Sequence, residues 1–316
     1  MTQPLISAII CTHNRASYLR GAIASLMGQT YPTYEIIVVD NASTDDTKAV
    51  VDAFLPHPAL TYAYESTLGL SAARNRGAAI ARGRILAYLD DDAEASPHWL
   101  AALAEVFEQY PEAAIAGGQV SLIWPQGMTA PRWLSPTLSE SLGTYDLGAA
   151  IRPITTPGQT PRGLNYAVKK SFLDTVGGFD PQLGRVGKNL LSNEELHLTQ
   201  QALAASLEVL YAPQAQVAHN VAPERLRRRW FLRRSWWQGI SECHREQAAG
   251  TLTLGRVRVR GICLLRGLVK AVRHWPDPAL RFENLVYAYG QLGYVLSGLR
   301  HLLPRPGTKR AADSLA

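Results

Sequence analysis

Residues 84–92 read RILAYLDDD, in which a mostly apolar run leads directly into three aspartates. The apolar part has the length and composition of a buried strand, predicted over Arg84–Leu89. The three carboxylates repel one another and raise one another's pKa unless a cation neutralises them. Mg²⁺ and Mn²⁺ prefer such oxygen ligands and commonly share them with substrate phosphates. The stretch therefore predicts a metal–diphosphate site at Asp90–Asp92, with a solvated acidic turn as the simpler alternative.

Short apolar runs alternate with helical patterns through the first 120 residues, as they do in parallel α/β folds. Strands are predicted over Leu5–Cys11, Glu35–Asp40, Leu60–Tyr64 and Ala114–Val120. Helices are predicted over Ser17–Met27, Asp45–Leu55, Ser71–Arg82 and from Pro97 onward. The order of these elements predicts an open α/β sheet.

The second part of the chain is less regular. Residues 124–165 are rich in Pro, Gly, Ser and Thr, which predicts a long loop or flap. Helices are then predicted over Lys169–Val176 and Asn193–Ser206, and short strands over Leu207–Tyr211 and Gln216–His219. From Glu224 onward the pattern is helical and basic.

Polar clusters follow three of the predicted strands where those strands end. They are Thr12–Arg15, Asp40–Ser43 and Asp90–Asp92. Because ligands bind at the carboxyl ends of strands in open parallel sheets, the clusters should converge on one edge. Any one of them alone could be a helix cap or a turn, but three in register predict a binding site. Residues 69–77 add small side chains that allow close backbone approach, and Arg74 among them could meet phosphate or ribose.

The net charge of +6 conceals two parts of opposite sign. Residues 1–223 hold 14 Lys and Arg against 20 Asp and Glu, whereas residues 224–316 hold 18 against 6. The Arg- and Trp-rich run at 225–237 suits the headgroup zone of an anionic membrane, and residues 284–299 are too few to span a bilayer. Helices packed on the first part or on a second subunit are the alternative. No nucleic-acid module accompanies the basic run.

The cysteines and the N-terminal sequence indicate the cellular compartment. Cys11, Cys243 and Cys263 lie far apart and in no metal-ligand spacing, which indicates reduced thiols. The chain runs directly into a predicted strand at Leu5, without the pattern of a signal peptide. Both features predict a cytoplasmic protein, peripheral on the inner face of the membrane if the basic run binds lipid.

An ordered set of motifs resembles family 2 glycosyltransferases with the GT-A fold. The motifs are SAIICTHNR, EIIVVDNASTDDT, LGLSAARNRGAAIARGRILAYLDDD, GGFD (Gly177–Asp180), NEEL (Asn193–Leu196) and APQAQVAH (Ala212–His219). The resemblance covers roughly residues 5–245. It implies a Rossmann-like GT-A catalytic domain over 1–223, with a nucleotide-binding half (1–120) and an acceptor half (121–223), followed by a basic helical extension (224–316).

The resemblance also implies roles for individual residues. Those expected at the nucleotide-sugar are Thr12, Asn14 and Arg15 around the nucleotide, Asp40 on the base with Asn41 and Ser43 in its cluster, Arg74, and Asp91 on the ribose. Asp90 and Asp92 correspond to the metal-binding DxD motif, with Asp92 as the direct ligand of Mn²⁺ or Mg²⁺. The catalytic base maps to Glu195; because the family usually has Glu-Asp here, Glu194 stays an alternative. Gln201 stands where an Arg often follows, and His219 could approach the metal or be a structural histidine.

The implied reaction is a single displacement with inversion at the anomeric carbon. The donor would be a nucleotide-sugar, with UDP favoured because Asp40 can accept from a uracil N–H, although guanine offers one too. The acceptor would be a hydroxyl of a glycan or lipid-linked molecule in polysaccharide or glycolipid synthesis. Two other classes are a metal-dependent nucleotidyltransferase, for which Thr12–Tyr18 lacks a glycine-rich phosphate loop, and a non-catalytic nucleotide-sugar-binding membrane protein, against which the intact acids argue.

Overall fold

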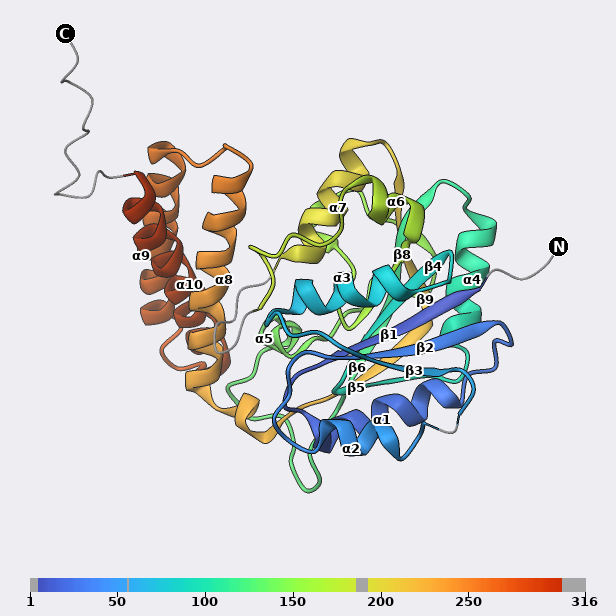
Figure 1. Cartoon of the computed structure of the whole chain (residues 1–316). Helices are drawn as coiled ribbons and strands as arrows, with labels where there is room; N and C mark the ends of the chain where they lie inside the picture. The colour runs from blue at the N-terminus through green and yellow to red at the C-terminus, as the bar shows by residue number, and fades with distance from the viewer. Residues whose placement is uncertain (1–4, 56, 186–192, 303–316) are drawn as a thin grey trace, which may run out of the picture. The chain divides into compact units, whose positions relative to one another are not determined.

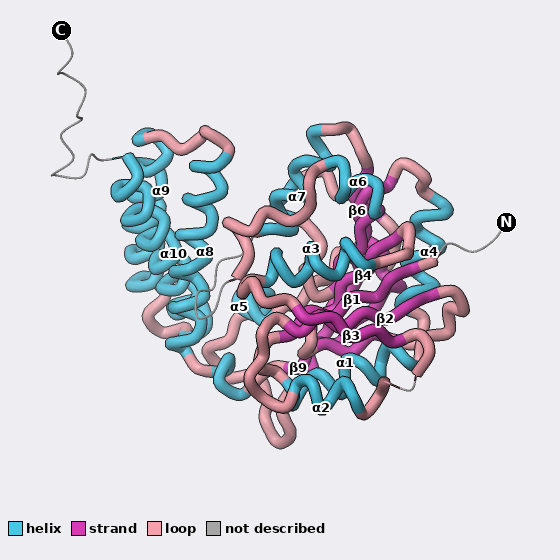
Figure 2. The backbone as a smooth tube through the Cα atoms, viewed as in Figure 1, coloured by secondary structure: helices cyan, strands magenta, loops and turns pink. Residues whose placement is uncertain are grey.

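The computed structural model describes residues 5–55, 57–185 and 193–302. Its chain forms two compact units, one ending at Trp230 and one beginning at Phe231. The first unit is a mixed α/β layer structure, and Figure 2 shows its strands gathered between helices. The second unit is helical. The predicted α/β class with a helical C-terminal region is confirmed.

Among the described residues, the first unit contains a nine-stranded sheet in the order β3-β2-β1-β4-β8-β6-β9-β5, with β7 paired to β9. One block of parallel neighbours is formed by β1 (Ile6–Thr12), β2 (Tyr34–Asp40), β3 (Leu60–Tyr64) and β4 (Ile85–Asp90). The remaining strands are β5 (Ala93–Ala95), β6 (Ala113–Ile123), β7 (Arg152–Pro153), β8 (Asn165–Lys169) and β9 (Glu208–Asn220). Since β2 and β4 flank β1 on opposite sides, the chain order reverses there, and the carboxyl ends of β1 and β4 open a crevice.

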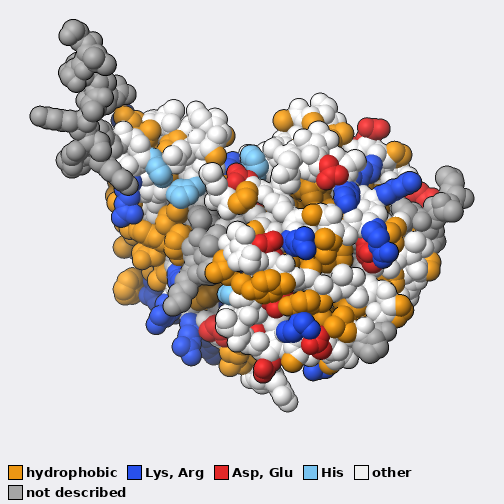
Figure 3. Space-filling view, in the orientation of Figure 1, with side chains coloured by type: hydrophobic (Ala, Val, Ile, Leu, Met, Phe, Trp, Pro, Cys, Tyr) orange, Lys and Arg blue, Asp and Glu red, His pale blue; other side chains and the backbone are white. Residues whose placement is uncertain are grey.

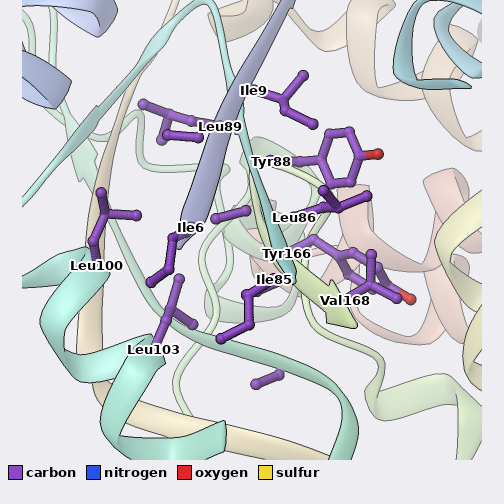
Figure 4. Close-up of a cluster of buried hydrophobic side chains, with 14 of the residues drawn as sticks. Ile6, Ile9, Ile85, Leu86, Tyr88, Leu89, Leu100, Leu103, Tyr166 and Val168 are labelled. Atoms are coloured by element: carbon purple, nitrogen blue, oxygen red, sulfur yellow. The ribbon is translucent and has the colours of Figure 1, made fainter. Parts of the chain in front are cut away.

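Helices cover both faces of the sheet. They are α1 (Ala16–Met27), α2 (Thr47–Asp52), α3 (Leu70–Ile80), α4 (Trp99–Gln109), α6 (Lys170–Thr175) and α7 (Glu194–Ala204). Figure 1 shows α1 and α2 on one face and α3 on the other. This explains why β1 and β4 are buried along almost their whole length instead of alternating. Figure 4 shows their side chains, with those of β8 and α4, filling the core on both sides of the sheet.

Helix α3 approaches the sheet closely because its inner side carries small residues. A Cβ atom on Gly77 would lie 2.6 Å from Cγ2 of Ile9. Ala73 and Ala78 are buried on the same helix. The alanine- and glycine-rich sequence of this segment therefore brings the helix, and with it Arg74, against the carboxyl edge of the sheet.

The structure corrects three of the predictions from sequence. The segment 124–165 is not one long loop: it contains α5 (Pro136–Ser139), the short 3₁₀ helices η1 (Glu140–Leu142) and η2 (Pro157–Gln159), and β7. Strand β8 was not predicted, because it begins directly after this Pro- and Gly-rich segment. The two short strands predicted over 207–219 are one long strand, β9, which pairs with β6 across irregularities of register.

Asn165 joins three elements at the centre of the sheet. Its buried side chain accepts a hydrogen bond from Nε1 of Trp99 on α4 (2.8 Å). It also donates to the carbonyls of Ala215 (2.7 Å) and Gln119 (3.2 Å), on β9 and β6. Gly117 leaves room for this arrangement, since a Cβ atom there would lie 2.3 Å from the Asn165 carbonyl oxygen. A single buried amide thus fixes α4, β6 and β9 relative to β8.

In the described part of the second unit the chain forms three helices. They are α8 (Arg228–Ala248), whose first turn precedes the unit, α9 (Leu254–Arg273) and α10 (Pro278–Leu302). Glycines allow α8 and α10 to approach closely: a Cβ atom on Gly239 would lie 2.0 Å from the carbonyl oxygen of Gly290. Helix α9 packs along α10 through Gly267, which faces Tyr287 and Ala288. Within the described residues, none of the helices combines the length and the apolar character that crossing a bilayer requires.

Replacing Asn165 by Leu should destabilise the first unit strongly. The substitution keeps the branching at Cγ but leaves the indole N–H of Trp99 and two buried carbonyls unpaired, which should lower the free energy of unfolding by about 3 kcal/mol. Urea titration followed by tryptophan fluorescence measures the loss. A loss below about 1 kcal/mol would contradict the role given to this amide.

Candidate active site

The loops after β1 and β2 are tied together by side-chain hydrogen bonds. The backbone N–H of Asn14 donates to Oγ of Ser43 (3.0 Å), and Oδ1 of Asn14 accepts from the N–H of Thr44 (2.7 Å). Asn14 and Ala42 both adopt left-handed backbone conformations, with φ of 54° and 56°. For Ala42 such a conformation is unfavourable by roughly 1–2 kcal/mol and is typical of functional loops. The two clusters predicted to converge therefore lie side by side.

Asp40 and Asn41 organise the backbone around them. Asp40 accepts hydrogen bonds from the N–H of Ser43 and the hydroxyl of Tyr62, both at 2.9 Å. Asn41 accepts from the N–H of Gly69 (2.8 Å) and donates to the carbonyl of Thr67 (2.7 Å). Asn41 thus connects the end of β2 to the loop that begins α3.

A cavity of about 250 Å³ opens at the carboxyl ends of β1 and β4. Its lining residues are Cys11, Thr12, His13, Arg15, Asn41, Leu68, Gly69, Leu70, Ala73, Asp90, Asp91, Asp92, Arg185 and Arg225. Of the predicted donor-site residues, Thr12, Arg15, Asn41 and the three aspartates line it. Asn14, Asp40, Ser43 and Arg74 are not among the lining residues.

Asp92 is buried and contacts two arginines and a histidine. Its Oδ2 contacts the guanidinium groups of Arg15 and Arg225, the latter at 2.9 Å, and its Oδ1 lies 3.3 Å from Nε2 of His219. Burial by itself would raise the pKa of Asp92, but the neighbouring His219 and the charges of Arg225 and Arg15 outweigh it. The pKa of Asp92 is therefore held below its usual value, and the group is ionised.

Asp91 shows the opposite behaviour. Burial, reinforced by the charge of Asp92, raises its pKa to about 7, although Arg15 lies 3.4 Å away and acts in the other direction. Asp91 is therefore partly protonated near neutral pH. A cation bound beside it would favour its ionised form.

His219 presents a nitrogen lone pair to this cluster, where Arg225 donates to it. Its Nδ1 lies 2.5 Å from the carbonyl oxygen of Leu142, so the proton is assigned to Nδ1. Nε2 is then an acceptor, 2.9 Å from a guanidinium nitrogen of Arg225. Nε2 of His219 and Oδ1 of Asp92 are therefore two possible metal ligands, one nitrogen and one oxygen. No group of three possible metal ligands occurs within the described parts of the chain, but Mg²⁺ is commonly held by one or two protein ligands plus substrate phosphates.

A second charged cluster surrounds Arg74, whose guanidinium is buried. Its Nη1 lies 2.8 Å from Oε1 of Glu195 and 3.1 Å from Oε1 of Glu194, and its Nη2 lies 3.8 Å from Oδ1 of Asp90. Both glutamates belong to the first turn of α7, where the helix dipole favours negative charge. From the sequence, Arg74 was expected to contact phosphate or ribose. In the structure its guanidinium lies between the two glutamates and Asp90.

The two glutamates differ in environment. Burial and the charge of Glu195 raise the pKa of Glu194 to about 8, and its Oε2 has no hydrogen-bond partner among the described residues. For Glu195, burial is outweighed by Arg74 and by a backbone N–H, so its pKa is lowered. The side chain of Glu195 is 15% exposed and that of Glu194 only 2%. At neutral pH the accessible carboxylate is Glu195.

Two residues at the cavity were missed as site residues. Arg225 was placed with the membrane-directed basic run, yet it contacts Asp92. Arg185 was not considered, and it lines the cavity. The sequence gives little signal for either, because an arginine that pairs across the fold looks like any other arginine in a basic or loop segment.

Solved structures share this fold. The mannosyltransferase PcManGT from Pyrobaculum calidifontis, determined with GDP-Man and Mn²⁺, aligns with a TM-score of 0.56 at 20% identity, over 97% of this chain and 78% of that one. GalNAc-T7, determined with UDP, GalNAc and Mn²⁺, aligns with a TM-score of 0.55 at 20% identity, over 76% of this chain and 48% of that one. The fold is that of GT-A transferases.

The family follows from sequence comparison. The model of Glycosyl transferase family 2 matches residues 7–164, half of the chain, and this protein belongs to that family. Two relatives from Haloferax volcanii are a glucosyl-dolichyl phosphate glucuronosyltransferase, 27% identical over 75% of this chain and 76% of its own, and the glycosyltransferase AglE, 27% identical over 70% and 69%. The chain is therefore a glycosyltransferase, which favours this class over the nucleotidyltransferase and non-catalytic alternatives.

Glu194→Gln should flatten the pH dependence of stability. A folded-state pKa of about 8, above the ordinary 4.5, means that the folded protein binds this proton more tightly. The associated stability is present below pH 4.5 and is lost as the pH rises through 8, so the wild type should lose roughly 3 kcal/mol from this group between pH 5 and 8. The neutral amide cannot ionise, so the variant should keep that stability.

The measurement is urea unfolding at pH 5, 6, 7 and 8 for wild type and variant. Glu208→Gln, at an exposed position on β9, is the matched control and should follow the wild-type profile. Parallel profiles for wild type and Glu194→Gln would show that Glu194 is not held protonated.

Proposed function

We propose that this enzyme transfers a sugar from a nucleotide-sugar to an acceptor hydroxyl with inversion at the anomeric carbon, in a metal-dependent reaction of glycoconjugate synthesis. The observation that carries the proposal is the separation of two acids around Asp90. On one side stands Asp92, ionised and facing His219; on the other stands Glu195, ionised, accessible and held by Arg74. Asp92 suits the binding of a cation that accompanies the donor's diphosphate, and Glu195 suits the role of proton acceptor.

The donor's diphosphate and a divalent cation are proposed to bind at the aspartate cluster. Oδ1 of Asp92 and Nε2 of His219 would hold Mn²⁺ or Mg²⁺, with Asp90 beside them. When bound, such an ion offsets charge that develops on the departing diphosphate. Arg15 and Arg225 already face Asp92 and could turn toward phosphate oxygens, for which guanidinium groups are well suited.

The nucleoside is proposed to lie over the ends of β1 and β2. Thr12 and Asn41 line this part of the cavity, and Asn14 and Ser43 hold its two loops together. The carboxylate of Asp40 uses one lone pair on each oxygen for Ser43 and Tyr62, so acceptor capacity is left for a base N–H. Uracil and guanine both offer that donor, in accord with the UDP and GDP-Man of the two structural neighbours.

Glu195 is the proposed general base. Its carboxylate takes the proton of the acceptor hydroxyl, the acceptor oxygen attacks C1, and the nucleoside diphosphate leaves from the opposite face. Arg74 keeps Glu195 ionised and orients it. Cys11, the thiol at the cavity, has its pKa raised to about 12 mainly by burial and is protonated, which disfavours a covalent route through sulfur.

A glycan or lipid-linked molecule is the proposed acceptor. The name of one Haloferax volcanii relative includes a dolichyl phosphate acceptor, and the alignment with it spans three-quarters of both chains.

Two isosteric substitutions separate the proposed roles. Glu195→Gln should lower kcat by about 10³-fold, in the range of a lost general base, while Mn²⁺-dependent donor binding stays within about twofold of wild type. Glu194 should not substitute for it, because its side chain is almost fully buried. Asp92→Asn should lose both transfer and the Mn²⁺ dependence of donor binding.

Calorimetric titration of UDP- and GDP-sugars with and without Mn²⁺, together with product analysis by mass spectrometry, measures both effects. Asp52→Asn, at an exposed position on α2, is the matched control. Equal Mn²⁺-dependent affinity in wild type and Asp92→Asn would refute the metal assignment, and undiminished transfer by Glu195→Gln would refute the base.

A further inference from the structure

Helix α9 exposes a continuous set of apolar side chains, here termed the apolar stripe. Its members and their exposed fractions are Ile262 (42%), Leu265 (63%), Leu268 (43%), Val269 (68%) and Val272 (71%). They recur at spacings of three and four residues, so they lie along one side of the helix. Trp275, 68% exposed, follows at its end. Such contiguous exposure marks an interaction site more often than it occurs by chance.

The stripe is not the side on which α9 packs within its own unit. That side is formed by Val257, Gly267 and Ala271, which are buried. Gly267 faces α10, and Arg260 reaches Glu242 of α8 at 2.6 Å. The helix therefore has one side devoted to the helical unit and another that remains apolar and open.

A row of cations borders the stripe. Arg266, Lys270 and Arg273 are exposed and recur at spacings of four and three residues, which places them along the neighbouring edge of the helix. Within the described residues, no carboxylate lies within 4 Å of these three, whereas Arg256 and Arg260 pair with Glu246 and Glu242. Helix α9 contains six basic and no acidic residues. Figure 3 shows hydrophobic side chains gathered on the helical unit with Lys and Arg beside them.

We propose that the apolar stripe and its cationic edge form a docking surface for an anionic lipid bilayer, with α9 lying in the plane of the interface. Apolar side chains would enter the boundary of headgroups and acyl chains while the cations meet lipid phosphates. The indole of Trp275, stacked under Arg281 at 4.8 Å, suits the same zone. The inference goes beyond the transfer reaction and does not depend on it.

Charge favours this occupant over a second copy of the chain. Two α9 helices meeting through their stripes would bring two rows of unpaired cations together, and like charges across an interface are repulsive. An anionic surface is complementary to the row. The segments chosen from sequence, 225–237 and 284–299, are less suited, because they pack on each other. Ser235 and Trp236 contact α10, and Gly290 and Gly293 face α8.

Flotation of the full chain with vesicles tests the proposal. Vesicles of phosphatidylcholine with 30% phosphatidylglycerol should bind the wild type at least tenfold more tightly than pure phosphatidylcholine, and 0.5 M NaCl should weaken the binding by a similar factor. Val269→Glu/Val272→Glu places charges at two highly exposed positions and should reduce binding at least tenfold. Leu55→Glu/Met128→Glu, at exposed apolar positions of the first unit, is the matched control and should bind as the wild type does.

A second variant separates charge from apolar insertion. Arg266→Gln/Lys270→Gln/Arg273→Gln should remove most of the preference for the anionic vesicles. The proposal is overturned if the wild type does not float with anionic vesicles, or if the Glu variant floats as well as the control. It is equally overturned if the Glu variant lowers the melting temperature markedly or dissociates a wild-type dimer in light scattering, since the stripe would then be covered by the chain itself or by a second copy.

Discussion

The buried guanidinium of Arg74 is the interaction on which the acidic end of the site depends. Two adjacent glutamates and a nearby aspartate share this one cation. Taking carboxylates out of water costs several kcal/mol each unless the charge is compensated. Arg74, with Arg185 acting at longer range, does not offset the burial of all these acids, so the charge is distributed unequally: Glu195 stays ionised and Glu194 retains its proton. The asymmetry that the proposed general base requires arises from burial that the available positive charge offsets for only one of the two glutamates.

The fold supplies that cation through close packing. Arg74 reaches the acids because α3 lies near the sheet, and α3 lies near the sheet because Gly77 has no side chain to keep it from Ile9. Gly163 makes a similar contribution from the other side, since a Cβ atom there would collide with Oε1 of Glu195. Small residues at two positions therefore determine where a large charged residue can stand.

Much of the nucleotide-binding part was predictable from sequence, because its strands are continuous apolar runs and each ends in a polar cluster. Leu60–Tyr64 was predicted with its observed bounds, and β1, β2 and β4 within one residue. The remainder depends on contacts distant in sequence. Strand β8 follows a segment whose composition indicates a loop, although Tyr145 and Ile154 within that segment are buried. The placement of Arg74 against Glu194, 120 residues away, has no local signature at all.

The basic C-terminal part shows the same limit most clearly. Composition places Arg225, Arg260 and Arg266 in one class, yet the structure separates them by their partners. Arg225 meets Asp92 at the cavity, Arg260 joins α9 to α8, and Arg266 stands beside exposed leucine and valine side chains. A cation beside a buried carboxylate stabilises a site, whereas a cation beside an exposed apolar surface has no anionic partner within the described fold. The net positive charge of this region therefore comes from two kinds of cation. Some are already paired within the fold, and others, such as Arg266, have no carboxylate within 4 Å among the described residues.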